Sequence, residues 1–488
     1  MDDTMDKFEV AGVAIGIVKD GKIIYTKGYG VKSINTKKKV DEHTQFAIAS
    51  NSKAFTSAAL AILVDEGKLS WQDKVVDHIP EFKMYNDYVT NNFNIQDLLT
   101  HRSGLGLGIG DLMFFPNGAD FTIDDILTSF QYFKPQSAFR TKFDYDNLLY
   151  VVAGEVVKRV SGVTWEEFVA TRILDPLGMD KSASSLSRVK DVANLASPHD
   201  TESGKMVALG QFDDMINGAA GGIYANVDDL CQWMLVHLNE GKYGKDLEKQ
   251  LFTVESQREM WKIHTTLEPN RNPRYNSHFS GYGLGWGLTD VKGNMQVSHT
   301  GGLPGMLSKT TLIPDLELGV VVLTNTSNGG AGVFSVVSQT IIDSYLGLDD
   351  FGWTEIYLNY FNSQKNAGDS VTTEVWKTVA KSDKTAINPQ DYIGVYKDNW
   401  FGKVEVFLKG DQLWFKSYRS PKLNGPMAYY KANSFAIKWE FQDMNADAFA
   451  MFSLDENGKA VSIKMKGISP NIDFSFDFQD LDLQRVEE

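Results

Sequence analysis

A serine and a lysine lie three residues apart in the segment Ser50-Asn51-Ser52-Lys53. The apolar run that follows, residues 54–63, predicts a buried helix, so both side chains would lie on one face near its N-terminal end. A serine hydroxyl becomes a good nucleophile only when a neighbouring group takes its proton, and a lysine amine one turn away can do so. The segment therefore predicts a nucleophilic serine beside a base.

The Ser-x-x-Lys pattern is weak by itself, because ordinary residue frequencies give about two chance matches in a chain of this length. Ser187 and Lys190 form one such match. The apolar helix after Ser50 favours Ser50 over Ser187, and two further polar motifs follow it along the chain. A plain helix N-cap is the competing interpretation of Ser50.

The second motif is a tyrosine and an asparagine, Tyr145 and Asn147, before a predicted helix over residues 148–160. Arg140 and Lys142 precede it, and nearby cations lower the pKa of a phenol, so Tyr145 is predicted to act as a base. Asn147 is predicted to hold the lysine amine and a substrate amide oxygen. The same Tyr-x-Asn spacing also begins at Tyr224, Tyr357 and Tyr360.

The third motif, His299-Thr300-Gly301-Gly302, follows a predicted strand over residues 295–298, and His-x-Gly occurs nowhere else in the sequence. Glycines at a strand end let a substrate backbone approach closely. The Gly302 N–H is therefore predicted to donate to an oxyanion. A structural histidine at the end of a strand is the competing interpretation of His299.

The order of the three motifs resembles that of the serine β-lactamase and penicillin-recognising superfamily, in its class C-like branch. This branch includes class C β-lactamases, D-alanyl-D-alanine carboxypeptidases, D-aminopeptidases and family VIII esterases. The separations, 95 residues from Ser50 to Tyr145 and 154 from Tyr145 to His299, are similar to those of the branch and favour Tyr145 over the other tyrosines. Residues 98–105 and 281–286 also look like family segments, and the resemblance covers about residues 8–346.

The resemblance implies roles for the motif residues. Ser50 would be the acylated nucleophile, and Lys53 and Tyr145 would share the duties of general base and general acid. Asn147 would orient the lysine and the substrate. The N–H groups of Ser50 and Gly302 would form the oxyanion hole.

His299 departs from the β-lactamases, which carry lysine at this position. A histidine is charged only part of the time near neutral pH, so peptidase or esterase action is expected rather than efficient β-lactamase action. We expect no cofactor and no metal, because no cluster of His, Cys, Asp and Glu has the spacing of metal ligands.

Strand patterns at both ends of the region, with helical patterns between about residues 55 and 236, predict an α+β fold. One antiparallel sheet is expected to combine the N- and C-terminal parts, with a helical insertion between them. The resemblance implies the class C β-lactamase-like fold, with helices on both faces. We expect this serine hydrolase domain to cover residues 1–346, a linker with short helices 347–388, and an all-β barrel, similar to the lipocalin-like domain of some members, 389–488.

The composition excludes some partners. With 488 residues and a net charge of −15, the chain is not expected to bind nucleic acid or an anionic membrane surface. It has no run of 18 apolar residues, so no membrane span is expected. The single cysteine, Cys231, excludes an internal disulfide and fits a core position. We expect a periplasmic or extracellular protein whose export signal has been removed, or else a cytoplasmic one.

These patterns predict a serine hydrolase that cleaves amide or ester bonds through an acyl-enzyme. The resemblance implies small peptides containing D-amino acids as the first choice of substrate and a carboxylesterase as the second. The patterns also allow a penicillin-binding sensor that does not turn over, or a carrier that works through its barrel. The expected partner is a small molecule or short peptide, and the sequence leaves the oligomeric state open.

Overall fold

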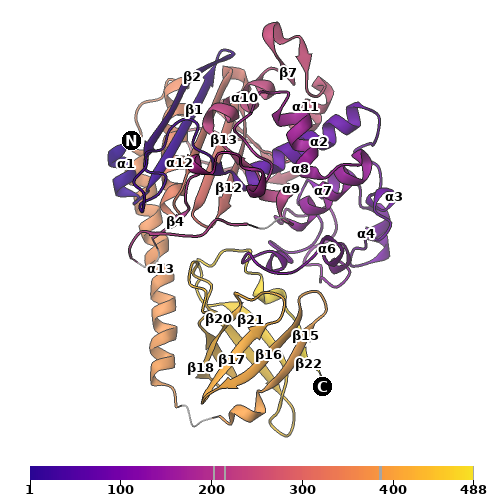
Figure 1. Cartoon of the computed structure of the whole chain (residues 1–488), viewed down its shortest axis with the longest axis vertical. Coiled ribbons are helices and arrows are strands. Elements are labelled where there is room, and N and C mark those ends of the chain that lie inside the picture. The colour runs from indigo at the N-terminus through magenta and orange to yellow at the C-terminus, as the bar shows by residue number, and fades with distance from the viewer. Residues whose placement is uncertain (202–203, 214–215, 384–386, 487–488) are drawn as a thin grey trace.

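The computed structural model describes residues 1–201, 204–213, 216–383 and 387–486 (Figure 1). The chain forms an N-terminal domain of sheet and helices and a C-terminal β-barrel. A long helix, α13 (Trp353–Lys381), runs beside both domains and connects them.

The N-terminal domain is built on an eight-stranded antiparallel sheet of order β2-β1-β14-β13-β12-β11-β10-β9. β1 pairs with β14 along its length, from Val13 opposite Thr324 to Lys19 opposite Leu318, so the two ends of the domain share one sheet as predicted. The strands are β1 (Gly12–Lys19), β2 (Lys22–Gly30), β9 (Thr265–Leu267), β10 (Ser280–Tyr282), β11 (Gly287–Val291), β12 (Asn294–Leu303), β13 (Met306–Ile313) and β14 (Leu318–Thr324).

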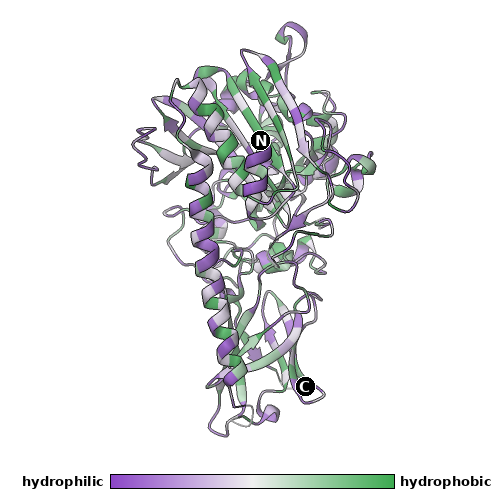
Figure 2. Ribbon diagram, turned by 90° about the vertical axis from the view of Figure 1, so that its left-hand side faces the viewer, coloured by the Kyte–Doolittle hydropathy of each residue, from purple (hydrophilic) through white to green (hydrophobic). Residues whose placement is uncertain are grey.

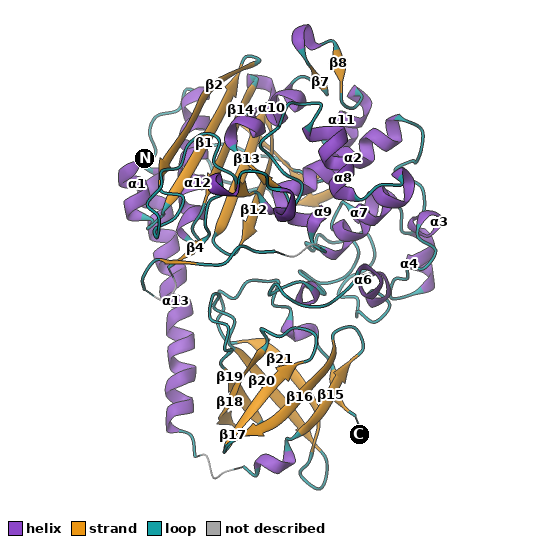
Figure 3. Cartoon of the chain, in the orientation of Figure 1, coloured by secondary structure: helices purple, strands orange, loops and turns teal. Residues whose placement is uncertain are grey.

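Helices cover both faces of this sheet (Figure 3), which confirms the predicted fold class. α12 (Gly329–Tyr345) packs on β13 and β14, and α10 (Val227–Leu238) packs on β1 and β14. The remaining helices of the domain are α1 (Asp2–Lys7), α2 (Ser52–Asp65), α3 (Val75–His78), α4 (Asp87–Asn92), α5 (Ile95–Leu98), α6 (Ile123–Ser129), α7 (Leu148–Ser161), α8 (Trp165–Val169), α9 (Gly218–Gly221) and α11 (Val254–Met260).

α2 lies at the centre of the helical part, where α7, α8 and α9 contact it. Every side chain from Ser52 to Leu63 is buried, as the apolar run predicted. Three pairs of two-residue strands complete the domain: β3 (Phe46–Ala47) with β6 (Tyr224–Ala225), β4 (His199–Asp200) with β5 (Val207–Ala208), and β7 (Lys242–Tyr243) with β8 (Lys249–Gln250).

The glycine-rich segment 283–288 has the pattern of a strand, but only residues 287–288 belong to one, as the start of β11, and residues 283–286 form the turn between β10 and β11. Gly285 has a φ of +79°, a conformation that residues with a Cβ rarely adopt. A Cβ there would lie 2.8 Å from the Lys53 carbonyl oxygen. The glycine therefore serves a turn that closely approaches α2.

Residues 347–388 differ from the prediction of a linker with short helices, because most of them form a single 29-residue helix, α13 (Trp353–Lys381). Its two ends pack on different domains. The Trp353 indole N–H donates to Asp343 Oδ2 of α12 (2.7 Å), and Val375 is buried against Ala436 and Ile468 of the barrel. Figure 2 shows that many residues of this helix between its two ends are hydrophilic, which explains why the sequence has the pattern of a linker.

Within the described ranges, no helix combines the length and apolar character needed to cross a membrane.

The C-terminal domain is a closed barrel of eight strands, in which β22 pairs back to β15. Buried rings of the barrel pack on one another, for example Phe415 on Trp439 (centroids 5.6 Å apart) and Phe435 on Phe452 (5.5 Å). These aromatic side chains fill space that a carrier would need for its ligand. The strands are β15 (Gly394–Asp398), β16 (Gly402–Lys409), β17 (Gln412–Ser417), β18 (Asn424–Lys431), β19 (Ser434–Ile437), β20 (Ala448–Leu454), β21 (Ala460–Gly467) and β22 (Leu483–Arg485).

The barrel docks on the helical part of the N-terminal domain through charged and aromatic contacts. Arg419 of the barrel pairs with Asp120 (2.7 Å) and Asp125 (2.8 Å), and its guanidinium lies 4.0 Å from the centroid of the Phe121 ring. Phe476 of the barrel contacts Phe115, with ring centroids 5.0 Å apart. The two domains therefore form a continuous interface in addition to their covalent connection.

Candidate active site

Ser50 lies in a single 3₁₀ turn, Ala49–Asn51, that leads directly into α2. Ala49 has a φ of +48°, a left-handed conformation that is unfavourable for a residue with a Cβ. Contacts from the sheet hold this turn: Ser308 Oγ of β13 donates to the Ile48 carbonyl (2.7 Å) and accepts from Asn51 Nδ2 (2.8 Å). The turn thus presents Ser50, which is partly exposed, at the start of a buried helix.

The Lys53 side chain lies behind Ser50 and is completely buried. Its Nζ is 3.1 Å from Ser50 Oγ, 2.7 Å from Asn147 Oδ1 and 2.9 Å from the Ala220 carbonyl oxygen. Burial lowers the pKa of Lys53 to about 7, although the nearby carboxyl groups of Asp111 and Asp146 act in the opposite direction. The amine is therefore able to lose or gain a proton near neutral pH.

Tyr145 meets the same two residues. Its phenol is hydrogen bonded to Ser50, and its ring centroid is 4.8 Å from Lys53 Nζ. Burial raises the pKa of Tyr145, so the predicted lowering by two cations is wrong. Arg140 and Lys142 bind carboxylates instead, with Arg140 Nε 2.9 Å from Asp97 Oδ1 and Lys142 paired with Asp144. Tyr145 is a neutral phenol that can donate a proton.

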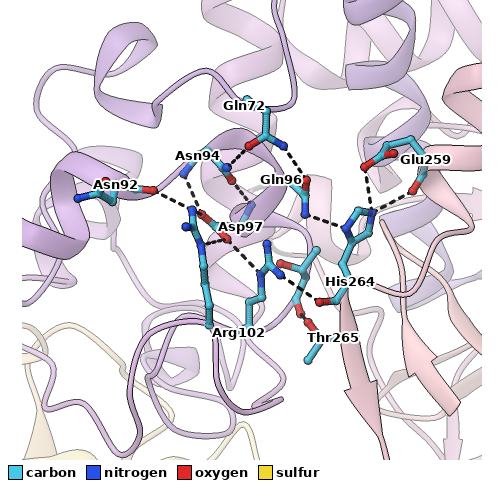
Figure 4. A network of polar contacts seen from close by, with 11 residues as sticks. Gln72, Asn92, Asn94, Gln96, Asp97, Arg102, Glu259, His264 and Thr265 are labelled. Carbon is cyan, nitrogen blue, oxygen red and sulfur yellow. Dashed lines mark hydrogen bonds and ion pairs between the residues drawn. The ribbon is translucent and has the colours of Figure 1, made fainter.

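The Asp97 carboxylate is the centre of a polar network that the sequence does not reveal (Figure 4). It is completely buried and accepts from Arg102 Nε (3.1 Å) as well as from Arg140. Arg102 Nη1 also donates to the His264 carbonyl (3.0 Å), just before β9. The network thereby ties the segment that leads to Tyr145 to the edge of the sheet.

Asn147 connects Lys53 to an aspartate that sequence reasoning missed. Its Oδ1 accepts from Lys53, and its Nδ2 donates to Asp111 Oδ2 (2.8 Å). Asp111 is completely buried, and this burial raises the pKa of its carboxyl group well above the usual range. No local sequence pattern distinguishes Asp111 from an ordinary turn aspartate.

His299 and Gly302 lie on β12 and line the same cavity as Tyr145, and the His299 and Tyr145 ring centroids are 6.3 Å apart. His299 Nδ1 donates to the Thr300 carbonyl (2.5 Å), so Nε2 accepts from the Tyr282 hydroxyl (2.8 Å). Burial and the neighbouring Lys53 lower the pKa of His299 to about 3. The expectation of a partly charged histidine is therefore wrong, and His299 is neutral at physiological pH.

One cavity of about 470 Å³ joins these residues. Ser50, Tyr145, Asn147, His299 and Gly302 all line it, and Lys53 lies beneath its floor. The structure therefore brings all six predicted site residues together. The opposite wall, which the sequence did not predict, comes from the barrel: Asp443, Met444, Asn445, Asn471, Asp473, Phe474 and Ser475.

Among the residues that the structure describes, no group of three or more His, Cys, Asp and Glu side chains is placed to hold a metal ion.

Comparisons with known families agree with this geometry. Residues 1–335 match the β-lactamase family model, and residues 380–485 match a domain of unknown function, DUF3471. The chain is 26% identical to the unguisins hydrolase ungD' of Aspergillus campestris, over 82% of this chain and 74% of that protein. It is 27% identical to protein flp of Staphylococcus aureus, over 66% of this chain and 61% of that protein.

Solved structures show the same fold. The octameric penicillin-binding protein homologue from Pyrococcus abyssi superposes with a TM-score of 0.63 at 22% identity, covering 96% of this chain and 97% of that one. A penicillin-binding protein from Bacillus halodurans gives a TM-score of 0.58 at 23% identity, over 70% of this chain and 99% of that one. A class C β-lactamase gives a TM-score of 0.54 at 19% identity, over 67% of this chain and 89% of that one.

The chain belongs to the β-lactamase family, within the serine β-lactamase and penicillin-binding protein superfamily. At the level of reaction class it is a serine hydrolase, and its C-terminal barrel corresponds to the DUF3471 region.

The contact between β12 and the Ser50 turn can be tested at Gly301. A Cβ there would lie 2.1 Å from the Ile48 carbonyl oxygen and 3.0 Å from the Ser50 nitrogen, so Gly301→Ala must displace the turn. We expect kcat/KM for a p-nitrophenyl ester to fall by about 100-fold, because a displacement of about 1 Å at a catalytic group has effects of this size. Gly210→Ala, where an added Cβ meets nothing within 4 Å, is the matched control. Equal activities of the two variants would contradict the importance of this contact.

Proposed function

We propose that this protein is a peptidase that hydrolyses short peptides containing D-amino acids, with Ser50 as the nucleophile and Lys53 as its base. The observation that carries the proposal is the set of three contacts at Lys53 Nζ. A neutral amine has two N–H donors and one lone pair. The carbonyl oxygens of Asn147 and Ala220 accept the two N–H bonds, which leaves the lone pair for the Ser50 hydroxyl.

The first half of the reaction is acylation. Ser50 Oγ bonds to the substrate carbonyl carbon while its proton passes to Lys53, and the carbonyl oxygen becomes an oxyanion. The N–H groups of Ser50 and Gly302 are proposed to stabilise that oxyanion. Its collapse breaks the bond to the leaving amine or alcohol, which takes a proton through Tyr145, and Lys53 restores the phenol proton.

The second half is deacylation. Water attacks the acyl-enzyme and gives its proton to Lys53, with Tyr145 connecting the amine to the reacting oxygen. The C–Oγ bond breaks, Ser50 recovers its proton, and the acid is released. This step separates the proposed enzyme from a sensor that stays acylated.

The cavity supports a short substrate without a strong carboxylate anchor. Its volume of about 470 Å³ falls within the usual range for small-molecule sites, about 300–1,000 Å³. Within the described part of the chain, its lining includes no lysine or arginine, whereas the carboxyl groups of Asp200, Asp443 and Asp473 line it. This balance favours peptides with a free amino group over penicillins, which carry a carboxylate.

A carboxylesterase is the second candidate, because neutral His299 suits a neutral ester. Peptide action remains our first choice, because the carboxyl groups that line the cavity suit a substrate with a free amino group.

The nucleophile can be tested by removing the hydroxyl of Ser50. Ser50→Ala is expected to abolish both turnover and covalent labelling by a fluorophosphonate, measured by intact mass. The fold should survive, because the side chain is partly exposed and a helix-start hydroxyl contributes only about 1 kcal/mol. Ser187→Ala is the control, and labelling that survives in Ser50→Ala but disappears in Ser187→Ala would refute the assignment.

The base can be tested by the pH dependence of kcat/KM. Only neutral Lys53 can accept a proton, so activity should rise as pH increases through its pKa of about 7 and level off above it. Lys53→Arg, which stays protonated, should be inactive across the whole range. A wild-type profile that stays flat between pH 5 and 9 would contradict a lysine base.

The neutral wall of the cavity can be tested with His299→Lys. A cation at this position should raise the ratio of kcat/KM for a penicillin over that for a neutral ester, because only the penicillin carries a carboxylate. His299→Gln, a neutral variant with hydrogen-bonding capacity, should leave the ratio close to that of the wild type. If the ratio is unchanged in His299→Lys, the side chain at position 299 does not contact the carboxylate that distinguishes the penicillin from the ester.

A further inference from the structure

The loop between β21 and β22 carries a barrel segment, residues 471–477, into the N-terminal domain; we call it the inserted loop. Phe474 of this loop meets the Tyr145 ring edge-on, with centroids 5.9 Å apart. A Cβ on Gly108 would lie 2.7 Å from the Phe474 carbonyl oxygen, so the two backbones are in close contact. The inserted loop is thus in direct contact with the catalytic cavity.

Two anchors hold the inserted loop in place. Asp477 is completely buried and accepts from the N–H groups of Gly110 (2.7 Å) and Leu112 (2.9 Å), on either side of Asp111. At the other end of the loop, Asn471 Nδ2 donates to the Gln364 carbonyl of α13 (2.7 Å). The loop is therefore fixed to both the Asp111 turn and the connecting helix.

Ser475 lies between these anchors and is buried, with 6% of its surface exposed. Its Oγ donates to Asp111 Oδ2 at 2.8 Å. The same oxygen accepts from Asn147 Nδ2, whose Oδ1 in turn accepts from Lys53 Nζ. A continuous chain of hydrogen bonds therefore runs from the barrel to the amine behind Ser50.

The direction of this chain matters, because a carboxamide can present either its oxygen or its NH₂ group to a neighbour. Two donors point at Asp111 Oδ2, whereas Oδ1 has no hydrogen-bond partner among the described residues. A proton on the buried carboxyl group is thereby directed to Oδ1. Oδ2 remains an acceptor, so Asn147 must turn its NH₂ group to Asp111 and its oxygen to Lys53.

Loss of the Ser475 hydroxyl would leave Oδ2 with a single donor. Burial favours the protonated form of Asp111, and the proton could then lie on Oδ2 and donate to a flipped Asn147. The flipped amide would present its NH₂ group to Lys53. That donor would compete with the Ser50 hydroxyl for the lone pair of the amine.

We propose that Ser475, supplied by the C-terminal barrel, is a positioning residue for hydrolysis at Ser50: it fixes the amide of Asn147 and, through it, the amine of Lys53. The inference rests on the proposed roles of Ser50 and Lys53. It gives the barrel a direct part in the chemistry of the other domain.

The test is made in the full-length protein and compares two buried serines, Ser469 and Ser475, which lie on either side of the anchor residue Asn471. Ser475→Ala should lower kcat for a p-nitrophenyl ester by about tenfold, because the base is mispositioned, and leave KM nearly unchanged. Ser469→Ala is the matched control, since Ser469 Oγ accepts from the Asn471 N–H at the start of the loop rather than donating to Asp111. Its kcat should match the wild type. An unchanged kcat in Ser475→Ala, or an equal loss in Ser469→Ala, would overturn the proposal.

A double-mutant cycle separates positioning from general loss of structure. If Ser475 acts through Asn147, then Ser475→Ala should cause no further loss of kcat in an Asn147→Ala background. Independent, multiplicative losses would overturn the proposal. Ser475→Thr keeps the hydroxyl and should retain the wild-type kcat. If Ser475→Thr instead loses as much kcat as Ser475→Ala while its Tm is unchanged, the inference is also contradicted. Wild-type inactivity would refute the proposed function instead.

Discussion

The complete burial of the Lys53 amine is the constraint on which the site depends. A buried ammonium is unfavourable unless its protons are all satisfied, and a buried neutral amine still needs acceptors for two N–H groups. Helices α7 and α9 meet this need, because Asn147 stands at the start of α7 and the Ala220 carbonyl belongs to α9. The packing around α2 therefore creates the environment in which a lysine can act as a base near neutral pH.

The sheet and the helical part meet at the Ser50 turn, and small residues make that meeting possible. Gly301 allows β12 to approach the Ile48 carbonyl, and Gly285 allows the β10–β11 turn to approach α2. Ser308 supplies the hydrogen bonds between the two layers. A left-handed alanine at position 49 is tolerated because these contacts fix the position of the turn.

The sequence predicts those parts of the architecture that are determined by residues close together in the chain. Ser50 and Lys53 share a helix, and the strand and helix periodicities predict the sheet, the insertion and the barrel. Contacts between distant segments are not predictable in this way. Arg140 binds Asp97 rather than approaching Tyr145, so the predicted lowering of the Tyr145 pKa is wrong. Asp111 and Ser475, 364 residues apart, meet only through the docking of two domains.

The 29-residue helix α13 also restricts the insertions and deletions that the protein can accept during evolution. An α-helix advances about 1.5 Å and rotates about 100° with each residue, so α13 is about 43 Å long and has a fixed rotational phase between its two packed ends. A single inserted residue would turn the barrel about the helix axis and withdraw the inserted loop from the cavity. An insertion of whole helical turns would keep the rotational position of the barrel but would still move the inserted loop outward by several ångströms. The length of this apparently featureless polar segment is therefore under stronger constraint than its composition.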